Sequence, residues 1–301
     1  MRVGAVDLGT NSTRLLVADA RNGVVREVGR GLRITRLGES VDTRGRLLPT
    51  AIARVRNVLT DYRRELELLG AERTLAVATS AVRDADNGEA FLAEIEWSYG
   101  FSTRLLSGDE EAALTFRGIA AARRLEPRTL IVDIGGGSTE LITADRHVSL
   151  DVGCVRLTER FGEDADATGA YVAALLPDWK VEKAIGVAGT VTSLAALDLG
   201  LVEYEPELVH GHRLSASSVD AQLRRLASLP LDERRRLPGL EPERAPVIVA
   251  GAAILREIVR HYGVDEIEAS EHDLLHGAAI EAAELPEPDE DTVPPGAFTC
   301  C

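Results

Sequence analysis

Two stretches of this chain repeat each other 126 residues apart. Residues 6–19 read VDLGTNSTRLLVAD and residues 132–145 read VDIGGGSTELITAD, and eight of the fourteen aligned positions are identical without a gap. The shared positions include Asp, Gly, Ser and Thr as well as common apolar residues, so the match is too specific for chance. A unit that occurs twice indicates a duplicated, two-lobed protein rather than a solenoid, which would need more copies.

Each copy has the pattern of a β-hairpin with a tip of small residues. An apolar run ends in Asp, a turn of Gly, Ser, Thr or Asn follows, and a second apolar run comes after it. The runs cover residues 3–8 and 14–18 in the first copy, and residues 130–134 and 140–144 in the second. We therefore expect one such hairpin in each lobe.

Helix and strand patterns alternate through the rest of the chain, which predicts an α/β fold. We expect the lobes to meet near residue 115, with residues 1–115 plus about 280–301 in the N-terminal lobe and residues 116–279 in the C-terminal lobe. The acidic, proline-rich stretch after Leu285 has the composition of a tail that need not be ordered. Helices are expected over 49–69, 89–99, 109–124, 219–228, 244–262 and 273–284 and from 191, and strands over 74–79, 102–106, 184–188 and 266–269.

The two hairpin tips are the strongest candidates for chemistry. Backbone N–H groups in a turn of small residues can converge on an anion, and small side chains let a phosphate approach closely. A carboxylate directly before the turn, as at Asp7 and Asp133, can hold a divalent cation against that phosphate. One such turn is often only a turn, but two copies with Asp at both strand ends favour phosphate binding.

The copies differ at one charged position, where Arg14 in the first is replaced by Glu140 in the second. The arginine could neutralise a phosphate, and the glutamate could bind Mg²⁺ or polarise a water molecule. The alternative for either residue is the ordinary one, an exposed charge on a strand.

Three further segments carry candidate residues. Arg83, which follows a predicted strand, is either a phosphate ligand or a loop arginine. The acids of SGDEEA (107–112) open a predicted helix, where negative charge is favourable in any case. Gly189 and Thr190 lie in a third small-residue turn before a helix, which could present N–H groups to an anion.

The formal net charge of −15 argues at first against any polyanionic partner. However, residues 1–260 carry 34 basic and 38 acidic residues, whereas residues 261–301 carry 11 acidic residues and no Lys or Arg. The excess is therefore mostly C-terminal, and it does not exclude a phosphate ligand in the body of the chain. We expect neither nucleic acid nor a membrane as a partner.

The three cysteines, Cys154, Cys300 and Cys301, form no disulfide framework or zinc pattern. No stretch approaches the roughly 18 apolar residues of a membrane span, and the start of the chain lacks the apolar core of a signal peptide. We expect a cytoplasmic protein. No role for Cys300, Cys301 or the acidic tail follows from the sequence.

Six motifs in order carry a family resemblance: DLGTNSTRLLVAD, ATSAVRDADNG, SGDEEA, VDIGGGSTEL, AGTVTSLAAL and ERAPVIVAG. Together they resemble the exopolyphosphatase / guanosine pentaphosphate phosphohydrolase family of the actin-like ATPase superfamily, from residue 1 to about residue 284. The resemblance implies two ribonuclease-H-like lobes around an interdomain cleft. It also implies Mg²⁺-dependent release of terminal orthophosphate, and it is compatible with a homodimer.

The resemblance assigns roles to single residues. Glu111 matches the catalytic glutamate that activates the attacking water, and Asp133 and Glu140 match the metal-binding and water-positioning carboxylates. Asp7, before the first tip, is a further metal candidate. With the turns described above, phosphate contacts are expected at Gly9, Thr10, Asn11, Ser12, Arg14, Arg83, Gly135, Gly136, Gly137, Ser138, Gly189 and Thr190.

Two departures from the family pattern bear on the substrate. SEHDLLHG (270–277) stands where many members have a Gly-Leu-Arg-Glu-Gly-like run, so an arginine there is missing. Longer members also carry additional C-terminal helical domains that extend the polyphosphate channel. From this we expect a preference for short polyphosphate chains.

Two other functions stay open. The same site could hydrolyse the alarmone guanosine pentaphosphate, or a catalytically weak protein could bind alarmone or polyphosphate as a sensor. The intact Glu111, Asp133 and Glu140 favour an enzyme. A kinase is disfavoured, by family analogy alone, because SGDEEA matches a motif that serves water rather than an acceptor hydroxyl.

Overall fold

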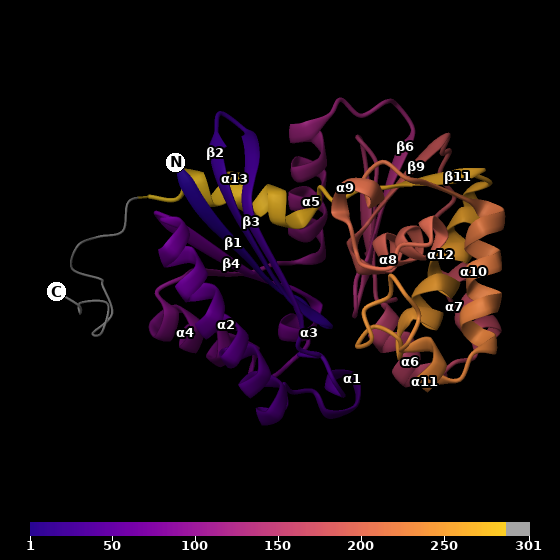
Figure 1. Ribbon diagram of the computed structural model, residues 1–301, viewed down its shortest axis with the longest axis horizontal. Coiled ribbons are helices and arrows are strands. Elements are labelled where there is room, and N and C mark those ends of the chain that lie inside the picture. The colour runs from indigo at the N-terminus through magenta and orange to yellow at the C-terminus, as the bar shows by residue number, and fades with distance from the viewer. Residues whose placement is uncertain (287–301) are drawn as a thin grey trace. The chain divides into compact units, whose positions relative to one another are not determined.

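Figure 1 shows the chain as a computed structural model, in which residues 1–286 are described. The first unit comprises Met1–Ser107, Arg117–Ala122 and residues 274–286, and the second comprises Gly108–Phe116 and Arg123–Asp273. Helix α5 (Gly108–Ala122) lies at the expected junction. Its residues 108–116 belong to the second unit, and its residues 117–122 belong to the first. The expected tail, with Cys300 and Cys301, lies outside the described residues.

The first unit is built on a five-stranded sheet in the order β3-β2-β1-β4-β5. Antiparallel pairs join β1 to β2 and β2 to β3, whereas β1, β4 and β5 run parallel. The first predicted hairpin is therefore confirmed as β1–β2. The strands are β1 (Arg2–Leu8), β2 (Ser12–Arg21), β3 (Val24–Ile34), β4 (Arg73–Ala78) and β5 (Ser102–Leu105).

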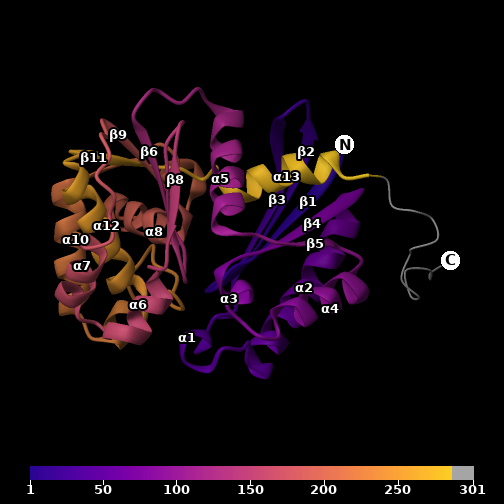
Figure 2. The same cartoon turned by 180° about the vertical axis from the view of Figure 1, so that it is seen from behind.

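Helices cover both faces of this first sheet (Figures 1 and 2). On one side lie α2 (Pro49–Leu69), whose bounds are those predicted, and α4 (Gly88–Tyr99). On the other side α13 (Leu274–Glu284) packs against β1, β2 and β4. The Tyr62 hydroxyl of α2 donates a hydrogen bond to the Thr13 carbonyl at 3.0 Å, which anchors β2 beside its tip. Two single-turn helices, α1 (Val41–Arg44) and α3 (Ser80–Arg83), complete the unit.

The second unit repeats this strand pattern and adds one strand. Its sheet has the order β10-β11-β9-β6-β7-β8, in which β8-β7-β6-β9-β11 corresponds to β3-β2-β1-β4-β5 with the same directions. The duplication seen in fourteen residues thus extends to all five strands of the first sheet. The strands are β6 (Thr129–Ile134), β7 (Thr139–Ile142), β8 (His147–Leu150), β9 (Lys183–Val187), β10 (Arg213–Ser215) and β11 (Glu266–Ala269).

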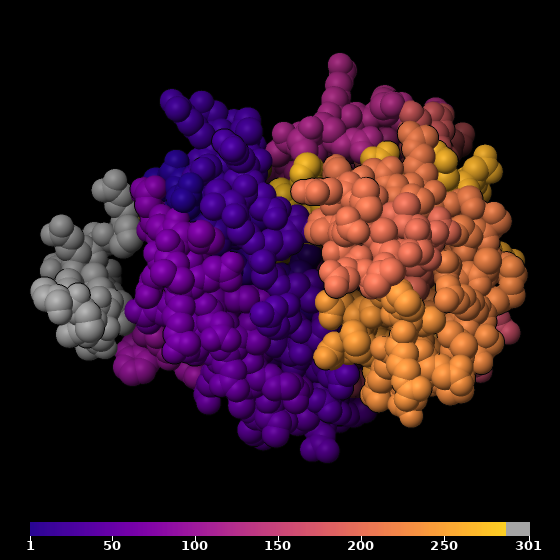
Figure 3. Space-filling model, in the orientation of Figure 1, coloured from indigo at the N-terminus to yellow at the C-terminus, as the bar shows by residue number. Residues whose placement is uncertain are grey.

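One long helix, α12 (Ile248–Tyr262), lies in the hydrophobic core of the second unit. It packs against α6 (Cys154–Phe161), α7 (Ala165–Ala173), α8 (Ala188–Leu199) and α10 (Ala216–Ser228). The segment between α8 and α10, which contains α9 (Pro206–Val209), lies on the surface of this unit (Figure 3). The single-turn α11 (Leu231–Arg234) connects α10 to the lead-in of α12.

The predicted α/β class with two lobes is confirmed, and three helix starts are corrected. α8 begins at Ala188 and α10 at Ala216, each three residues earlier than expected. We expected a helix from Arg244, but α12 begins at Ile248. Pro246 has no N–H to donate and disfavours helical backbone in the residue before it, so residues 244–247 form turns instead. Within residues 1–286, no helix is long and apolar enough to cross a membrane.

Candidate active site

The tip of the first hairpin is a tight turn held by its own backbone. The Gly9 N–H donates to the Ser12 carbonyl at 3.0 Å, and Asp7 lies opposite Arg14 in the β1–β2 register. Arg14 Nε and Nη2 both lie 2.8 Å from Asp7 Oδ2. The two residues to which we gave separate roles, phosphate contact and metal ligand, are therefore ion-paired with each other.

The carbonyls of this tip are tied to the segment after β3. The Asn11 carbonyl accepts hydrogen bonds from Thr35 N and Arg36 N, and the Thr10 carbonyl accepts one from Gly38 N at 2.8 Å. In a trans peptide, C=O and the following N–H point in opposite directions. The N–H groups of Asn11 and Ser12 therefore point away from residues 35–38, as a phosphate turn requires.

Arg83 also belongs to the first unit. It ends the single-turn α3, directly after β4, the parallel neighbour of β1. Its Nη1 donates to the Leu106 carbonyl at 2.8 Å, which fixes the guanidinium close to the backbone.

The tip of the second hairpin has the same construction as the first. The Gly135 N–H donates to the Ser138 carbonyl at 3.0 Å, and Asp133 lies opposite Glu140 in the β6–β7 register. The positions that form an Asp–Arg ion pair in the first unit thus hold two carboxylates in the second. This is the combination that suits a cation rather than an anion at that place.

The start of α6 fixes the conformation of the second tip. Cys154 N donates to the Gly135 carbonyl, Val155 N and Arg156 N donate to the Gly136 carbonyl, and Arg156 Nε donates to the Gly137 carbonyl at 2.7 Å. By the same peptide geometry, the N–H groups of Gly136, Gly137 and Ser138 point away from α6. Three N–H groups with similar directions make a nest, an arrangement that can bind an anion.

This arrangement requires the close approach of Gly153. A Cβ on Gly153 would lie 2.3 Å from the Gly136 carbonyl and 2.4 Å from Gly137 N. We expect Gly153→Ala to displace the nest, because the contacted atoms are backbone, and overpacking of this kind costs about 1–3 kcal/mol. The KM for the phosphate substrate should rise by about tenfold or more. Steady-state kinetics on a variant shown to be folded by circular dichroism checks this, and an unchanged KM would contradict it.

The three predicted carboxylates of the second unit are all buried. The exposed fractions are 8% for Glu111, 7% for Asp133 and 1% for Glu140. Thr115 of α5 donates from Oγ1 to Asp133 Oδ2 at 3.1 Å, and Ser149 Oγ donates to Glu140 Oε1 at 2.7 Å. Glu111 lies one turn before Thr115 and so on the same face of α5. The helix therefore presents Glu111 on the side that faces Asp133.

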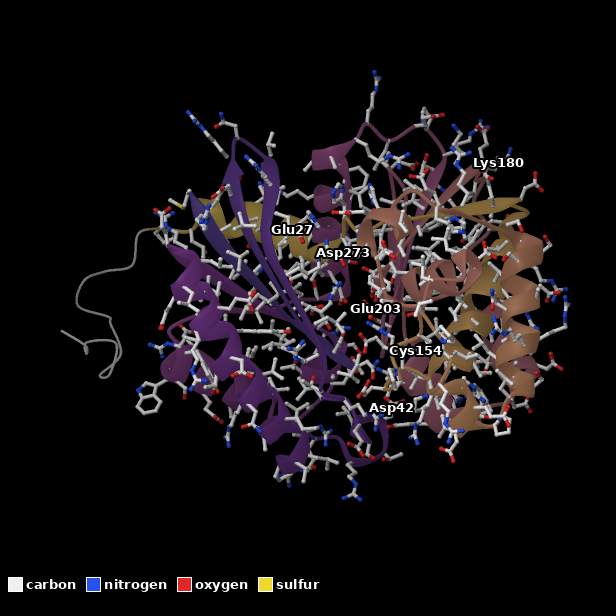
Figure 4. The ribbon with its side chains drawn as sticks, in the orientation of Figure 1. Glu27, Asp42, Cys154, Lys180, Glu203 and Asp273 are labelled. Carbon is white, nitrogen blue, oxygen red and sulfur yellow. The ribbon has the colours of Figure 1, made fainter. Side chains whose placement is uncertain are left out.

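Gly189 and Thr190, which we expected in a turn before a helix, lie instead in the first turn of α8, which we call the Gly189 turn. This turn lies beside Arg244, to which we assigned no role from the sequence. A Cβ on Gly189 would fall 1.8 Å from Nη1 of Arg244, so the guanidinium covers this backbone. Burial raises the pKa of the Cys154 thiol, and Arg244 acts in the opposite direction, which puts Arg244 within electrostatic reach of α6. Figure 4 labels Cys154 at this position inside the second unit. Arg244 thus lies over Gly189 and near Cys154 at the start of α6.

The structure therefore brings together one group of predicted residues in each unit. Glu111, Asp133 and Glu140 share the second unit with Gly135–Ser138, Gly189 and Thr190, whereas Asp7, the first tip, Arg14 and Arg83 belong to the first unit. Among residues 1–286, no group of three or more His, Cys, Asp or Glu side chains is arranged to hold a metal ion. The second hairpin instead places two carboxylates, Asp133 and Glu140, opposite each other as candidate cation ligands.

Sequence reasoning missed three contributors in the second unit: Arg244, Thr115 and Ser149. Thr115 could have been found, since it lies four residues after Glu111 and so shares its helix face. Ser149 and Arg244 reach the site through strand pairing and a distant turn, and no spacing in the sequence indicates this.

Two duplicated α/β units, each with a glycine turn behind a strand-end aspartate, define a phosphate-handling enzyme of the actin-like ATPase fold. The family model of the Ppx/GppA phosphatase family matches residues 16–284. The chain belongs to this family, and the prediction of an enzyme of the phosphoanhydride hydrolase class is confirmed.

Individual relatives cover nearly the whole chain. The chain is 38% identical to exopolyphosphatase 2 of Mycobacterium tuberculosis, over 94% of this chain and 98% of the relative. The crystal structure of the Aquifex aeolicus Ppx/GppA family member is similar, with a TM-score of 0.78, 29% identity and coverage of 94% and 98% of the two chains. An exopolyphosphatase from Cytophaga hutchinsonii gives a TM-score of 0.83 at 25% identity, covering 92% and 96%.

Proposed function

We propose that this chain is an exopolyphosphatase, which releases terminal orthophosphate from short inorganic polyphosphate with Mg²⁺ and a water molecule activated by Glu111. One observation carries the proposal. The nest at Gly136–Ser138 lies directly between the paired strands whose facing residues are Asp133 and Glu140, and α5 turns the Glu111 face toward Asp133. A phosphate-binding turn, two carboxylates for a cation and a separate buried base are the parts that phosphoanhydride hydrolysis needs.

In this proposal each candidate site residue of the second unit has a defined role. Glu111 accepts a proton from the water as it attacks the terminal phosphorus. The nest N–H groups and Arg244 hold the oxygens of the phosphoryl group in place and neutralise the charge that develops on them. Thr115 and Ser149 keep Asp133 and Glu140 in fixed orientations.

The donor set fits Mg²⁺, because this ion binds oxygen and typically uses one or two carboxylates, with waters and substrate phosphates completing its coordination. Asp133 and Glu140 would hold it. When bound, the cation would neutralise phosphate charge and lower the pKa of a coordinated water. Asp7 stays a predicted metal ligand, but its ion pair with Arg14 favours a different role, in which Asp7 orients Arg14 toward phosphate.

For the first unit we propose phosphate contacts from Gly9, Thr10, Asn11, Ser12, Arg14 and Arg83. The support is the matched construction of the two tips, whose Gly9–Ser12 and Gly135–Ser138 hydrogen bonds are both 3.0 Å long. Buried Asn11 adds an observation, since its Nδ2 has no hydrogen-bond partner among the described residues. A buried donor without a partner is costly unless a ligand satisfies it.

Hydrolysis of guanosine pentaphosphate is the second candidate function. It is favoured by the family, whose name covers both activities.

A panel of short polyphosphate, polyphosphate of several hundred units and guanosine pentaphosphate, each with Mg²⁺, separates the functions by orthophosphate release. We expect the highest kcat/KM on short polyphosphate and no release after chelation of the metal. Equal or better turnover of long chains would contradict the chain-length proposal. Faster release from the nucleotide would favour the alarmone, and saturable binding without release would favour a sensor.

A further inference from the structure

A fully buried arginine, Arg234, donates a hydrogen bond to the residue directly after Arg244. Arg234, at the end of α11, has an exposed fraction of 0%. Removing a guanidinium from water is costly unless its donors are satisfied. A guanidinium has five N–H donors, and Arg234 uses five hydrogen bonds: Nε to the Leu226 carbonyl, Nη1 to Glu163 Oε1 and to the Ala245 carbonyl, and Nη2 to Glu163 Oε2 and to the Leu229 carbonyl.

These acceptors come from three separate segments. Glu163 lies between α6 and α7, and it binds Arg234 through both oxygens at 2.8 and 3.1 Å. This ion pair lowers the pKa of Glu163, so the carboxylate is charged at neutral pH. Leu226 and Leu229 lie at the end of α10, where helix carbonyls lack partners within the helix. The third segment is the lead-in to α12, and its acceptor, Ala245, is the residue directly after Arg244.

Because Pro246 prevents α12 from starting earlier, the Arg244 backbone is not part of a regular helix. It is held by turn hydrogen bonds, such as Arg244 N to the Glu241 carbonyl at 2.9 Å, and by the 3.0 Å bond from Arg234 to Ala245. We propose that Arg234, with Glu163, is a positioning residue that holds the Arg244 guanidinium over the Gly189 turn for the phosphate substrate. This proposal rests on the proposed function of Arg244 as a phosphate contact.

A double-mutant cycle tests the coupling. We expect Arg244→Ala to lower kcat/KM for tripolyphosphate by about 10²-fold, as for the loss of one transition-state donor. Arg234→Lys, which cannot replace five planar donors with one ammonium group, should lower it about tenfold. The double variant should be no slower than Arg244→Ala alone, because both changes remove the same interaction. Arg235→Lys, at an exposed arginine paired with Asp232, is the matched control and should stay within twofold of the parent.

A purely structural role predicts a different result. The two single effects would then multiply in the double variant, or Arg234→Lys would lower the unfolding temperature without changing kcat/KM below it. Either outcome would overturn the proposal. If Arg234→Lys does not fold, Glu163→Gln replaces it in the cycle, because Glu163 is half exposed and glutamine keeps the shape of the acceptor.

A crystal structure of the folded variant separates this proposal from the proposed function. We expect Arg244 to leave the Gly189 turn in that structure while the sheet is unchanged, and an undisplaced Arg244 would refute the positioning role. If the parent protein neither binds nor hydrolyses tripolyphosphate, the proposed function fails, whereas the position of Arg244 still decides the structural half of the inference.

Discussion

Glu111→Gln is expected to lower kcat for orthophosphate release by about 10²–10⁴-fold, the usual contribution of a general base. Glutamine has the size of glutamate and fits the same buried place on α5, but it cannot accept the proton of the attacking water. Substrate binding should change little, because the nest and the arginines are untouched. Burst-free initial rates and calorimetric binding of tripolyphosphate measure the two effects separately.

Asp109→Asn is the matched control for this variant. Asp109 lies in the same first turn of α5, but its carboxylate is exposed and contacts His147 at 3.0 Å. We expect activity within about twofold of the parent, the effect of an ordinary surface substitution. Equal losses in Asp109→Asn and Glu111→Gln would mean that negative charge at the start of α5 matters, rather than a base at Glu111.

Asp133→Asn is expected to lower kcat/KM by about 10²–10³-fold, the range seen when one electrostatic contact to the reacting group is lost. Asparagine still offers an oxygen to Thr115 Oγ1, so the variant should fold, but it removes one of two charges available to Mg²⁺. The Mg²⁺ concentration for half-maximal rate should therefore rise. A magnesium titration of activity gives both quantities.

Thr115→Val separates the charge of Asp133 from its orientation. This change keeps the carboxylate and removes the hydrogen bond at 3.1 Å, and loss of such an orienting partner typically costs about 10–100-fold in metal affinity or activity. An Asp133→Asn variant with unchanged magnesium dependence would contradict the assignment of Asp133 to the cation.

The repeat in the sequence was informative because hairpin geometry is local. Residues equally far from a tip face each other, so Asp7 opposite Arg14 and Asp133 opposite Glu140 follow from the spacing once the hairpin is accepted. Even so, we assigned Asp7 and Arg14 separate tasks, although the register makes an ion pair the natural outcome. The helix over 49–69 was predictable for a similar reason, since its apolar spacing is regular and Pro and Gly mark its ends.

Other features depend on contacts between distant segments, and no local pattern reports them. Arg244 meets Gly189 across 55 residues, and the N–H groups of α6 that fix the second tip come from residues 154–156. β3 was not predicted because its run of Arg, Glu and Gly contains few apolar residues. It is the edge strand of its sheet and has no buried residue. Long-range packing, rather than propensity, therefore decides which residues complete the site.

The charge distribution is consistent with a site for phosphate despite the net charge of −15. Arginine lies at defined places in both units: Arg14 and Arg83 in the first, and Arg244 in the second. The forked guanidinium can donate two parallel hydrogen bonds to phosphate oxygens, which a lysine cannot do. The total charge thus says little about the local potential at the turns.

The central claim, that Glu111 activates water for phosphoanhydride hydrolysis in the second unit, is tested most directly by a single-turnover experiment. The enzyme, in excess over tripolyphosphate with Mg²⁺, should release one orthophosphate per bound substrate, and Glu111→Gln should bind the same amount and release about 10²–10⁴-fold more slowly. Equal release rates from the two proteins, or no release from the parent on saturable binding, would contradict the account.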